Sequence, residues 1–169
     1  MNTAILGIDP GLDGALALYD VDGSLEVVDM PTLQLKKRVI DEYALARIID
    51  AWSPRIREVW LEQVGTRPGE GAVGAFSFGR GYGLLRGICA ASFLTIIDVT
   101  PATWKAGMKV RGDKDASRAK ASALFPRHAS LWPLKKHDGR AEAALIARFG
   151  MLQSAPPPAA SSINLREAA

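Results

Sequence analysis

The stretch Ala4-Ile5-Leu6-Gly7-Ile8-Asp9 is a short apolar run that ends in an acid, directly before Pro10-Gly11. A run of this length bounded by a Pro-Gly turn signal is typical of a buried β-strand. Because a carboxylate at the end of a buried strand is costly to desolvate, a compensating cation is expected close to Asp9. The stretch therefore predicts a sheet protein with a charged group at a strand end.

The pattern on either side of this strand predicts further strands and helices. Strands are expected at 4–9, 15–19, 25–28, 58–62 and 95–99, with the turn signal Asp22-Gly23 between the second and the third. Helices are expected at 41–52, at about 73–93 after a glycine-rich loop at 66–74, after the cap Thr100, at 114–125 and from Asp138 onward. This order indicates an α/β or α+β sheet domain.

Length and composition indicate one ordinary globular domain. The 169 residues are 48% hydrophobic and 23% charged, with a mean hydropathy of +0.05. Such a chain can bury enough apolar surface to fold, which excludes disorder for most of it, and its glycines and prolines are not periodic as in collagen. We expect a domain at 1–150 and a flexible tail at 151–169, where Ala, Pro and Ser predominate.

Three features bear on the cellular compartment. The single cysteine, Cys89, cannot form an internal disulfide and lies in an apolar run, so a buried thiol in a reducing compartment is expected. No segment reaches the roughly 18 consecutive apolar residues of a membrane span. The first residues lack the basic start of a signal peptide. These features predict a cytoplasmic protein that does not enter membranes.

Four carboxylates stand where they can form one site. Asp9 and Glu62 end predicted strands, whereas Asp138 and Glu142 lie one turn apart on the last predicted helix and share a face. Carboxylate oxygens suit a hard divalent cation such as Mg²⁺. The chemistry expected of such a site is two-metal phosphodiester hydrolysis, with one ion activating water and the other, about 3.5–4 Å away, stabilising the leaving oxygen.

Three of the four acids also have a structural interpretation. Asp9 can be an ordinary turn residue, and Asp13 is a near alternative to it in the site. Asp138 can cap the last helix, which contributes about 1 kcal/mol, and Glu142 suits an early helical turn because of the helix dipole. The joint placement of the four acids favours a site.

Four short pieces of the chain follow one another at a characteristic spacing within residues 4–150. They are Ile5 to Gly11, Leu61-Glu62-Gln63-Val64, Thr100-Pro101-Ala102-Thr103-Trp104-Lys105 and His137 to Ala147. In this order they resemble the RuvC-like resolvases, endonucleases of the RNase H-like fold that cut four-way (Holliday) DNA junctions. The resemblance implies an α/β fold whose mixed sheet has three antiparallel strands followed by two parallel strands, flanked by helices.

The resemblance also implies the site and the partners. It makes Asp9, Glu62, Asp138 and Glu142 the catalytic metal ligands, with two Mg²⁺ ions in each active site and Mn²⁺ as the alternative. The implied substrate is branched DNA, especially the four-way junction, cut by paired symmetric nicks from a homodimer in a bacterial or phage-infected cell. The helix after Glu62 is similar to the dimer helix of the family. Its small residues permit close packing with a second copy or, equally, within the chain: Gly74, Ala75, Gly79, Gly81 and Gly83.

The chain departs from the usual family pattern at two places. Its last two acids are spaced i, i+4, as in phage-type and other divergent members, whereas bacterial resolvases usually have i, i+3. The aromatic residue that some members insert at the junction centre has no match in Gly65-Thr66-Arg67-Pro68; Phe76, Phe78 or Tyr82 are substitutes, or else core or dimer contacts. His137 is either a further ligand or a residue that packs before the helix.

Basic residues are concentrated late in the chain. The net charge is +3, but residues 101–150 hold 11 Lys and Arg against 4 Asp and Glu, whereas residues 1–100 hold 9 against 13. Such an excess is either the footprint of a polyanion or a solvated helical face. Beside a metal site it would neutralise phosphates without reading bases. The candidate DNA contacts are Lys105, Lys109, Arg111, Lys114, Arg118 and Lys120, with Arg67 and Arg80 near the junction centre.

Three other functions are alternatives to junction resolution. A nuclease of the same fold can instead cut flaps, other branched DNA or RNA–DNA hybrids. The stretch from Gly7 to Gly11 also resembles the first phosphate loop of the actin/hexokinase-type ATP-binding fold, but that fold needs two such domains, more than 169 residues supply. A DNA-binding module without catalysis has no support, because all four acids are present.

Overall fold

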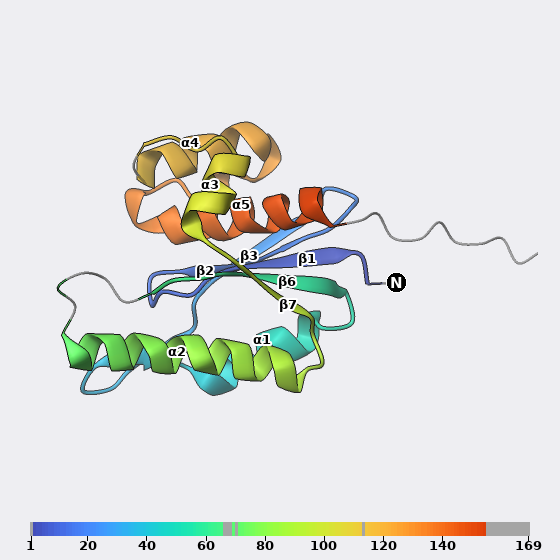
Figure 1. Ribbon diagram of the computed structural model, residues 1–169. Helices are drawn as coiled ribbons and strands as arrows, with labels where there is room; N and C mark the ends of the chain where they lie inside the picture. Colours follow the sequence, from blue (N-terminus) through green and yellow to red (C-terminus); the bar gives the residue numbers. More distant parts are fainter. Residues whose placement is uncertain (1, 66–68, 70, 113, 155–169) are drawn as a thin grey trace, which may run out of the picture.

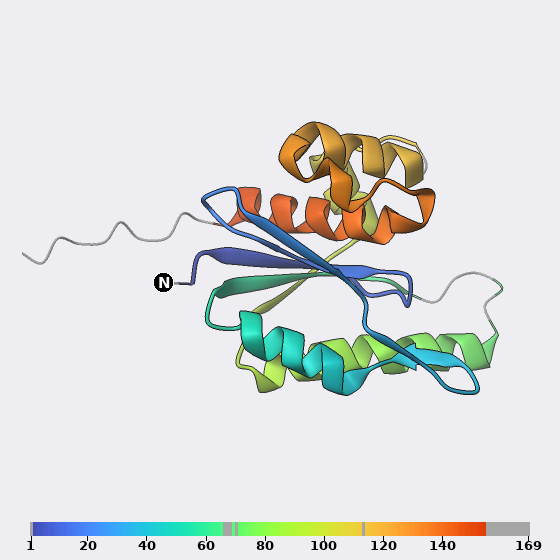
Figure 2. The same ribbon diagram turned by 180° about the vertical axis from the view of Figure 1, so that it is seen from behind.

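The computed structural model describes residues 2–65, 69, 71–112 and 114–154, and these form a mixed five-stranded sheet between helices (Figures 1 and 2). The strand order is β3-β2-β1-β6-β7, with β1 (Ala4–Asp9) at the centre. The strands β2 (Ala15–Tyr19) and β3 (Leu25–Asp29) continue from β1 as antiparallel neighbours. On its other side, β6 (Ile56–Glu62) and β7 (Ile96–Val99) run parallel to it. The predicted α/β class is confirmed, as is the mixed sheet of three antiparallel strands followed by two parallel strands.

Helices cover both faces of the sheet (Figure 1). One face carries α3 (Pro101–Gly107), α4 (Lys114–Leu124) and α5 (Asp138–Gln153), with the 3-10 turns η1 (Pro126–Leu131) and η2 (Lys135–His137) between α4 and α5. The other face carries α1 (Glu42–Trp52) and α2 (Ala72–Ala91). Successive residues of β1 point to opposite layers, so Ile5 belongs to the core on the α5 side and Leu6 to the core under α1 and α2.

Gly7 allows α5 to lie directly on the central strand. A Cβ atom at this position would lie 2.3 Å from the carbonyl oxygen of Ala143 and 2.4 Å from the backbone nitrogen of Ala147. Any side chain at residue 7 would therefore push the helix off the sheet. The small residues on both sides of this contact hold α5 against β1, and they bring the first turn of α5 to the end of that strand.

Most elements follow the predicted order, and two predicted caps are confirmed. The carboxylate of Asp41 accepts hydrogen bonds from the backbone N–H groups of Tyr43 and Ala44, and Thr100 caps α3. Cys89 is buried, as expected. The structure adds a hairpin that the pattern did not predict, β4 (Thr32–Gln34) with β5 (Arg38–Ile40). Strands of three residues are too short to show a periodic pattern.

Some expectations lie outside the described residues. They are those for Arg67, for much of the predicted loop at 66–74, for the side chain of Lys114 and for the tail from residue 155 onward. The helix α2 begins at Ala72, inside the predicted loop, and α5 continues to Gln153. Within the described ranges, none of the helices combines the length and the apolar character that crossing a bilayer requires.

Candidate active site

One cavity of about 660 Å³ at the carboxyl end of β1 brings all four predicted acids together. Its lining includes the two strand-end acids, the two helix acids and one lysine: Asp9, Glu62, Asp138, Glu142 and Lys105. The strand-end acids meet because β1 and β6 are neighbouring parallel strands, with Ile8 beside Leu61. Parallel neighbours end at the same edge of a sheet, which is where α/β proteins place their ligands.

Gly139 sets how closely α5 approaches these strand ends. A Cβ atom on it would lie 2.4 Å from the carbonyl oxygen of Asp13 and 3.1 Å from Oδ2 of Asp9. Glycine therefore lets the first turn of α5 pack on the β1–β2 turn, so that Asp138 and Glu142 face the strand-end acids. The capping interpretation of Asp138 is wrong, since His137 holds the cap position and Asp138 is already helical.

Two of the acids are held by donors from α3 and α4. The indole N–H of Trp104 donates to Glu62 Oε1 at 2.8 Å, and the Ser117 hydroxyl donates to Glu142 Oε1 at 3.0 Å. Both donors are fully buried. The Nζ atom of Lys105 lies 3.1 Å from the same Glu142 oxygen. Sequence reasoning missed Trp104 and Ser117 as site residues; the signal for Trp104 was that a buried indole N–H needs an acceptor.

The other three acids contribute to a shift in the pKa of Asp9. Its pKa is raised to about 7, first by burial and then by the negative charges of Glu62 and Glu142, with a smaller contribution from Asp138. The backbone N–H of Gly11, which donates to Asp9 Oδ1 at 3.4 Å, opposes the shift. Asp9 is therefore repelled by the negative charge of the other three acids, and a bound cation would relieve this repulsion.

The chemistry of this donor set fits a hard divalent cation. All four groups are carboxylates, which suit Mg²⁺ and Mn²⁺. As they stand, no three His, Cys, Asp or Glu side chains in the described part of the chain converge closely enough to hold an ion. Glu62 and Glu142 are instead directed at Trp104 and Lys105. A cation would have to compete with these contacts.

His137 lies outside the cavity lining. Its Nδ1 atom accepts a hydrogen bond from the backbone N–H of Leu134 at 3.4 Å, which closes the turn before α5. Its pKa is lowered, first by partial burial and then by the positive charges of Arg140 and Lys136. These contacts favour the interpretation of His137 as a residue that packs before the helix.

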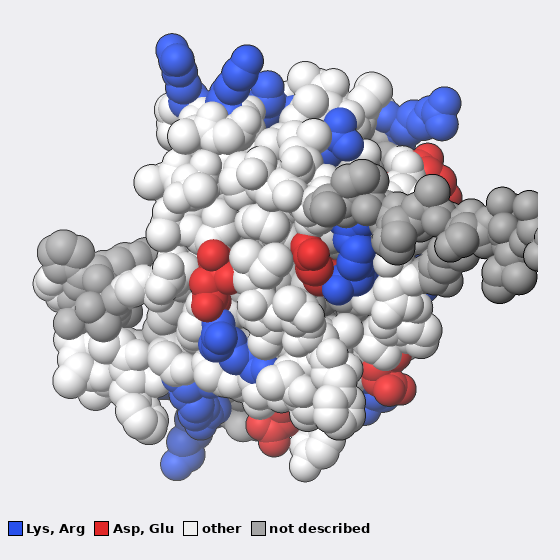
Figure 3. Space-filling view, turned by 45° about the vertical axis from the view of Figure 1, so that its right-hand side comes forward, with Lys and Arg blue, Asp and Glu red and all other residues white. Residues whose placement is uncertain are grey.

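The predicted DNA contacts are distributed unevenly around the cavity. Among the described side chains of that set, Lys105 alone lines it. Lys109 and Arg111 are exposed after α3, Lys120 is half-buried on α4, and Arg118 pairs with Asp115 at 2.5 Å. Figure 3 shows Lys and Arg side chains standing out at the top of the molecule, on the side of the α3–α4 layer. Arg80 lines a separate pocket under α2.

Two of the small residues of α2, Gly79 and Gly83, face away from the rest of the described chain. A Cβ atom on Gly79 or Gly83 would meet nothing within 4 Å, whereas one on Gly81 would lie 3.2 Å from Ile40. Val73 and Phe76, which are 70% and 76% exposed, lie near the start of the same helix. Intrachain packing therefore explains Gly81 but leaves Gly79 and Gly83 without a neighbour in the described chain.

The three aromatic residues of α2 have different surroundings. Phe78 lines the acidic cavity, and Phe76 is exposed to solvent. The hydroxyl of Tyr82 donates to Asp98 at 2.9 Å, and Arg86 pairs with the same carboxylate. Tyr82 is therefore a contact between α2 and β7, and Phe78 is the aromatic residue of this helix that a ligand in the cavity would meet.

Comparison with known proteins links the chain to junction resolvases. No protein-family model matches it. It is similar to the chloroplastic Holliday junction resolvase MOC1 of Chlamydomonas reinhardtii, with 34% identity over 86 residues, or 50% of this chain. The chain spans about 10% of the length of this curated relative.

Solved structures extend the likeness to most of the chain. Thermus thermophilus RuvC superposes with a TM-score of 0.57 at 17% identity, covering 87% of this chain and 94% of that one. T. thermophilus RuvC in complex with a Holliday junction substrate superposes with a TM-score of 0.60 at 14% identity. This match covers 92% of this chain and 99% of that one. The yeast mitochondrial Holliday junction resolvase Ydc2 superposes with a TM-score of 0.52 at 13% identity. This match covers 89% of this chain and 78% of that one. At these identities the likeness concerns the fold, and the expected RuvC-like fold is confirmed.

Proposed function

We propose that this protein is a metal-dependent endonuclease that resolves four-way DNA junctions. The observation that carries the proposal is the meeting of Asp9, Glu62, Asp138 and Glu142 with Lys105 in one cavity at the sheet edge. The named likenesses support the substrate, because one relative and one solved protein are named Holliday junction resolvases and one solved complex contains a Holliday junction substrate.

The four acids are proposed to hold one or two divalent ions, Mg²⁺ or Mn²⁺. When bound, such ions supply activation of the attacking water and charge stabilisation at the leaving oxygen. Asp9 is the central ligand in this proposal, since burial and the neighbouring acids disfavour its charge when no cation is bound. Trp104 and Ser117 act as positioning residues that fix the oxygens of Glu62 and Glu142.

Lys105 is proposed to bind the phosphate beside the cut bond. Its Nζ atom now pairs with Glu142, and its side chain is 36% exposed at the edge of the cavity. Entry of a phosphate would give the ammonium a second anionic partner within the same cavity. Lys109, Arg111 and Lys120 would neutralise phosphates farther along the strand, and Lys114, Arg118, Arg67 and Arg80 remain candidates for the same role.

Paired nicks require two active sites, and α2 is proposed to supply the dimer contact. Its outward glycines, Gly79 and Gly83, would allow a second helix to approach closely, and Val73 and Phe76 would be buried by it. A twofold dimer matches a four-way junction, whose arms are themselves related by twofold symmetry.

Cleavage of labelled DNA tests the proposal. A mobile four-way junction is compared with duplex, flap, bulge and RNA–DNA hybrid, with Mg²⁺ and with EDTA. Paired symmetric nicks confined to the four-way substrate are expected for the wild type. The variants Asp9→Asn and Glu62→Gln should lose cleavage and keep binding, whereas Asp50→Asn and Glu42→Gln, at exposed positions of α1, serve as matched controls and should cut normally.

Other outcomes select among the alternatives. Equal cutting of flaps or hybrids would keep the chemistry and widen the substrate to branched nucleic acids. Junction binding without metal-dependent cutting would identify a binding module. Cleavage by Asp9→Asn at the wild-type rate would contradict the assignment of the site.

A further inference from the structure

A short basic hairpin, which includes none of the predicted DNA contacts, lies on the α2 side of the active site. It is formed by β4 and β5, and its tip carries three consecutive cations, Lys36, Lys37 and Arg38. Figures 1 and 2 both place this hairpin next to α2, at the end of the molecule where β1 ends. The four acids gather at that same end.

The base of the hairpin is fixed to the rest of the chain. Ile40 is buried, and a Cβ atom on Gly81 of α2 would lie 3.2 Å from its Cδ1 atom. The backbone N–H of Asp41, the cap residue of α1, donates to the carbonyl oxygen of Pro31 at 2.8 Å. The hairpin therefore presents its tip from a defined place beside α2.

The tip carries positive charge that the rest of the chain does not neutralise. Every residue from Leu33 to Arg38 is exposed, and residues 30–40 contain no Asp or Glu. Neither Lys36 nor Lys37 pairs with an acid of the described chain. Two adjacent ammonium groups of this kind attract an anion that presents several charges, such as a phosphate backbone.

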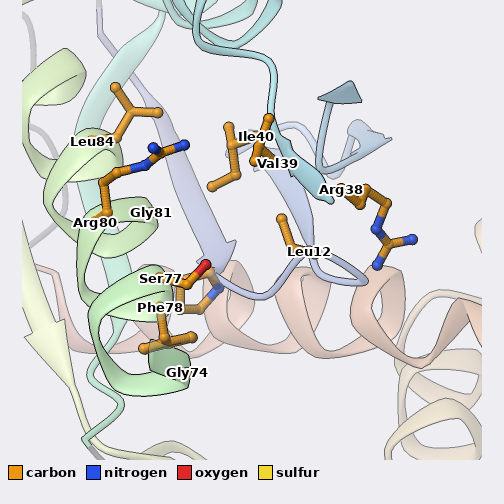
Figure 4. A pocket seen from close by; sticks show the side chains of 11 residues that line it. Leu12, Arg38, Val39, Ile40, Gly74, Ser77, Phe78, Arg80, Gly81 and Leu84 are labelled. Atoms are coloured by element: carbon orange, nitrogen blue, oxygen red, sulfur yellow. The ribbon is translucent and has the colours of Figure 1, made fainter. Parts of the chain in front are cut away.

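Arg38 connects the tip to the acidic cavity. Its guanidinium pairs with Asp13, which lines that cavity. In Figure 4 Arg38 points away from α2, whereas Arg80 points from α2 toward Ile40; both arginines line a pocket of about 260 Å³. None of the described residues that line this pocket is acidic. Positive charge therefore continues from the edge of the cavity to the tip of the hairpin.

The hairpin also exposes apolar side chains, which makes a second copy of the chain the alternative occupant. Leu33 and Leu35 are 43% and 64% exposed. A twofold contact between two such tips would, however, bring their cations together, and like charges across an interface disfavour association. The charge favours a polyanion, and the adjoining acidic cavity is proposed to bind DNA.

We propose that the hairpin tip binds the phosphate backbone of the junction arm that leaves the acidic cavity on the α2 side. Lys36 and Lys37 each neutralise one phosphate. Lys109, Arg111 and Lys120 act in the α3–α4 layer, on the other face of the sheet. Contacts on both sides of the acids fix the direction of the DNA without reading its bases. This inference rests on the proposed function and adds a surface that orients one arm.

Junction binding in EDTA, measured across a salt series, tests the hairpin separately from cleavage. Lys36→Gln combined with Lys37→Gln should lower the slope of log binding constant against log salt by about 1.8 in magnitude, because each phosphate contact contributes about 0.9. Arg47→Gln combined with Arg55→Gln is the matched control. It removes two exposed cations, on α1 and before β6, and should keep the wild-type slope. An unchanged slope in the hairpin variant overturns the proposal.

Cross-linking identifies what the tip contacts. Lys36→Cys, modified with a photoreactive aryl azide, should cross-link to one arm of the bound junction at a fixed number of nucleotides from the branch point. Arg47→Cys, treated in the same way, should not. The native Cys89 is buried and should stay unmodified in the folded protein. Cross-links confined to a second copy of the chain would assign the tip to an interface between copies and overturn the proposal.

The proposed function and the hairpin contact can fail independently. If the wild type cuts the junction with Mg²⁺ while the hairpin variant binds with the wild-type slope, the hairpin proposal is overturned and the nuclease stands. If no substrate is cut with Mg²⁺, the proposed function is overturned. A lower slope and arm-specific cross-links would in that case still support a DNA contact at the tip.

Discussion

Trp104 donates its indole N–H to Glu62 Oε1 at 2.8 Å inside the protein, so a residue of α3 orients the acid at the end of β6. The indole is fully buried, and Glu62 is only 6% exposed. Ser117 of α4 orients Glu142 in the same way at 3.0 Å. The α3–α4 layer, which carries none of the four acids, therefore sets the direction of two of them.

Replacing Trp104 with Phe should weaken metal use more than it weakens the fold. The change removes one donor to Glu62 while keeping an aromatic ring in the core. Loss of such an outer contact typically costs about 10–100-fold in metal affinity or activity. The Mg²⁺ concentration for half-maximal cleavage, measured beside thermal unfolding, checks this. Trp52→Phe, in the core under α1, is the control and should leave the Mg²⁺ midpoint unchanged. If both variants have the same Mg²⁺ midpoint, Trp104 contributes only to packing and does not position Glu62.

The cluster of acids should make the metal-free protein less stable as pH rises. The pKa of Asp9 is raised from 3.8 to about 7 in the folded state, so the folded state holds this proton more tightly than the unfolded state does. The resulting stabilisation is complete below pH 3.8 and is lost as pH rises through about 7. We expect Asp9→Asn to melt higher than the wild type near pH 8 and the difference to shrink near pH 5.

Divalent ions give the matching control for this pH effect. Mg²⁺ should raise the melting temperature of the wild type near pH 8 and should have little effect on Asp9→Asn. The exposed variant Asp50→Asn should behave as the wild type in both titrations. Parallel pH profiles for the wild type and Asp9→Asn would show that Asp9 is not the group responsible.

Replacing Gly139 with Ala should disrupt the site through a single methyl group. The new Cβ would lie 2.4 Å from the backbone oxygen of Asp13, so the first turn of α5 has to move away from the strand ends. Overpacking of this kind costs about 1–3 kcal/mol, and displacement of Asp138 and Glu142 should reduce cleavage at saturating DNA. Denaturant unfolding and single-turnover cleavage measure the two effects. Gly87→Ala, where a Cβ meets nothing within 4 Å, should not destabilise the protein.

Replacing Lys105 with Gln should remove one phosphate contact. The slope of log binding constant against log salt concentration should decrease in magnitude by about 0.9, and the cleavage rate should fall. Junction binding measured across a salt series tests this, with the exposed Arg47→Gln as a control. An unchanged slope would mean that Lys105 serves only as the partner of Glu142.

Placing a charge on the outer face of α2 should separate the proposed dimer. Gly83 has open space around its Cβ position, so Gly83→Arg is tolerated by the single chain but would obstruct a second helix. Light scattering should give twice the 18.1 kDa chain mass for the wild type and the single mass for the variant. Ala51→Arg, at an exposed position on α1, is the matched control. A monomeric wild type would contradict the dimer.

Local pattern was enough to predict the five strands of the sheet and to single out the four acids. The run that ends at Asp9 is β1, and the run that ends at Glu62 is the end of β6. Apolar periodicity and caps such as Asp41 act between residues that are close in sequence, so they can be read without knowing the fold. The meeting of Asp9 with Glu62 then follows from two parallel strands that end at the same edge of the sheet.

Tertiary structure alone decided how the acids are held and what surrounds them. Trp104 and Glu62 are 42 residues apart, and Ser117 and Glu142 are 25 apart, so no local pattern connects them. The same holds for the pocket that Arg80 shares with the unpredicted β4–β5 hairpin. Hydrogen-bond partners and cavities depend on how separate elements pack in space, whereas the propensity to form each element is carried by the local sequence.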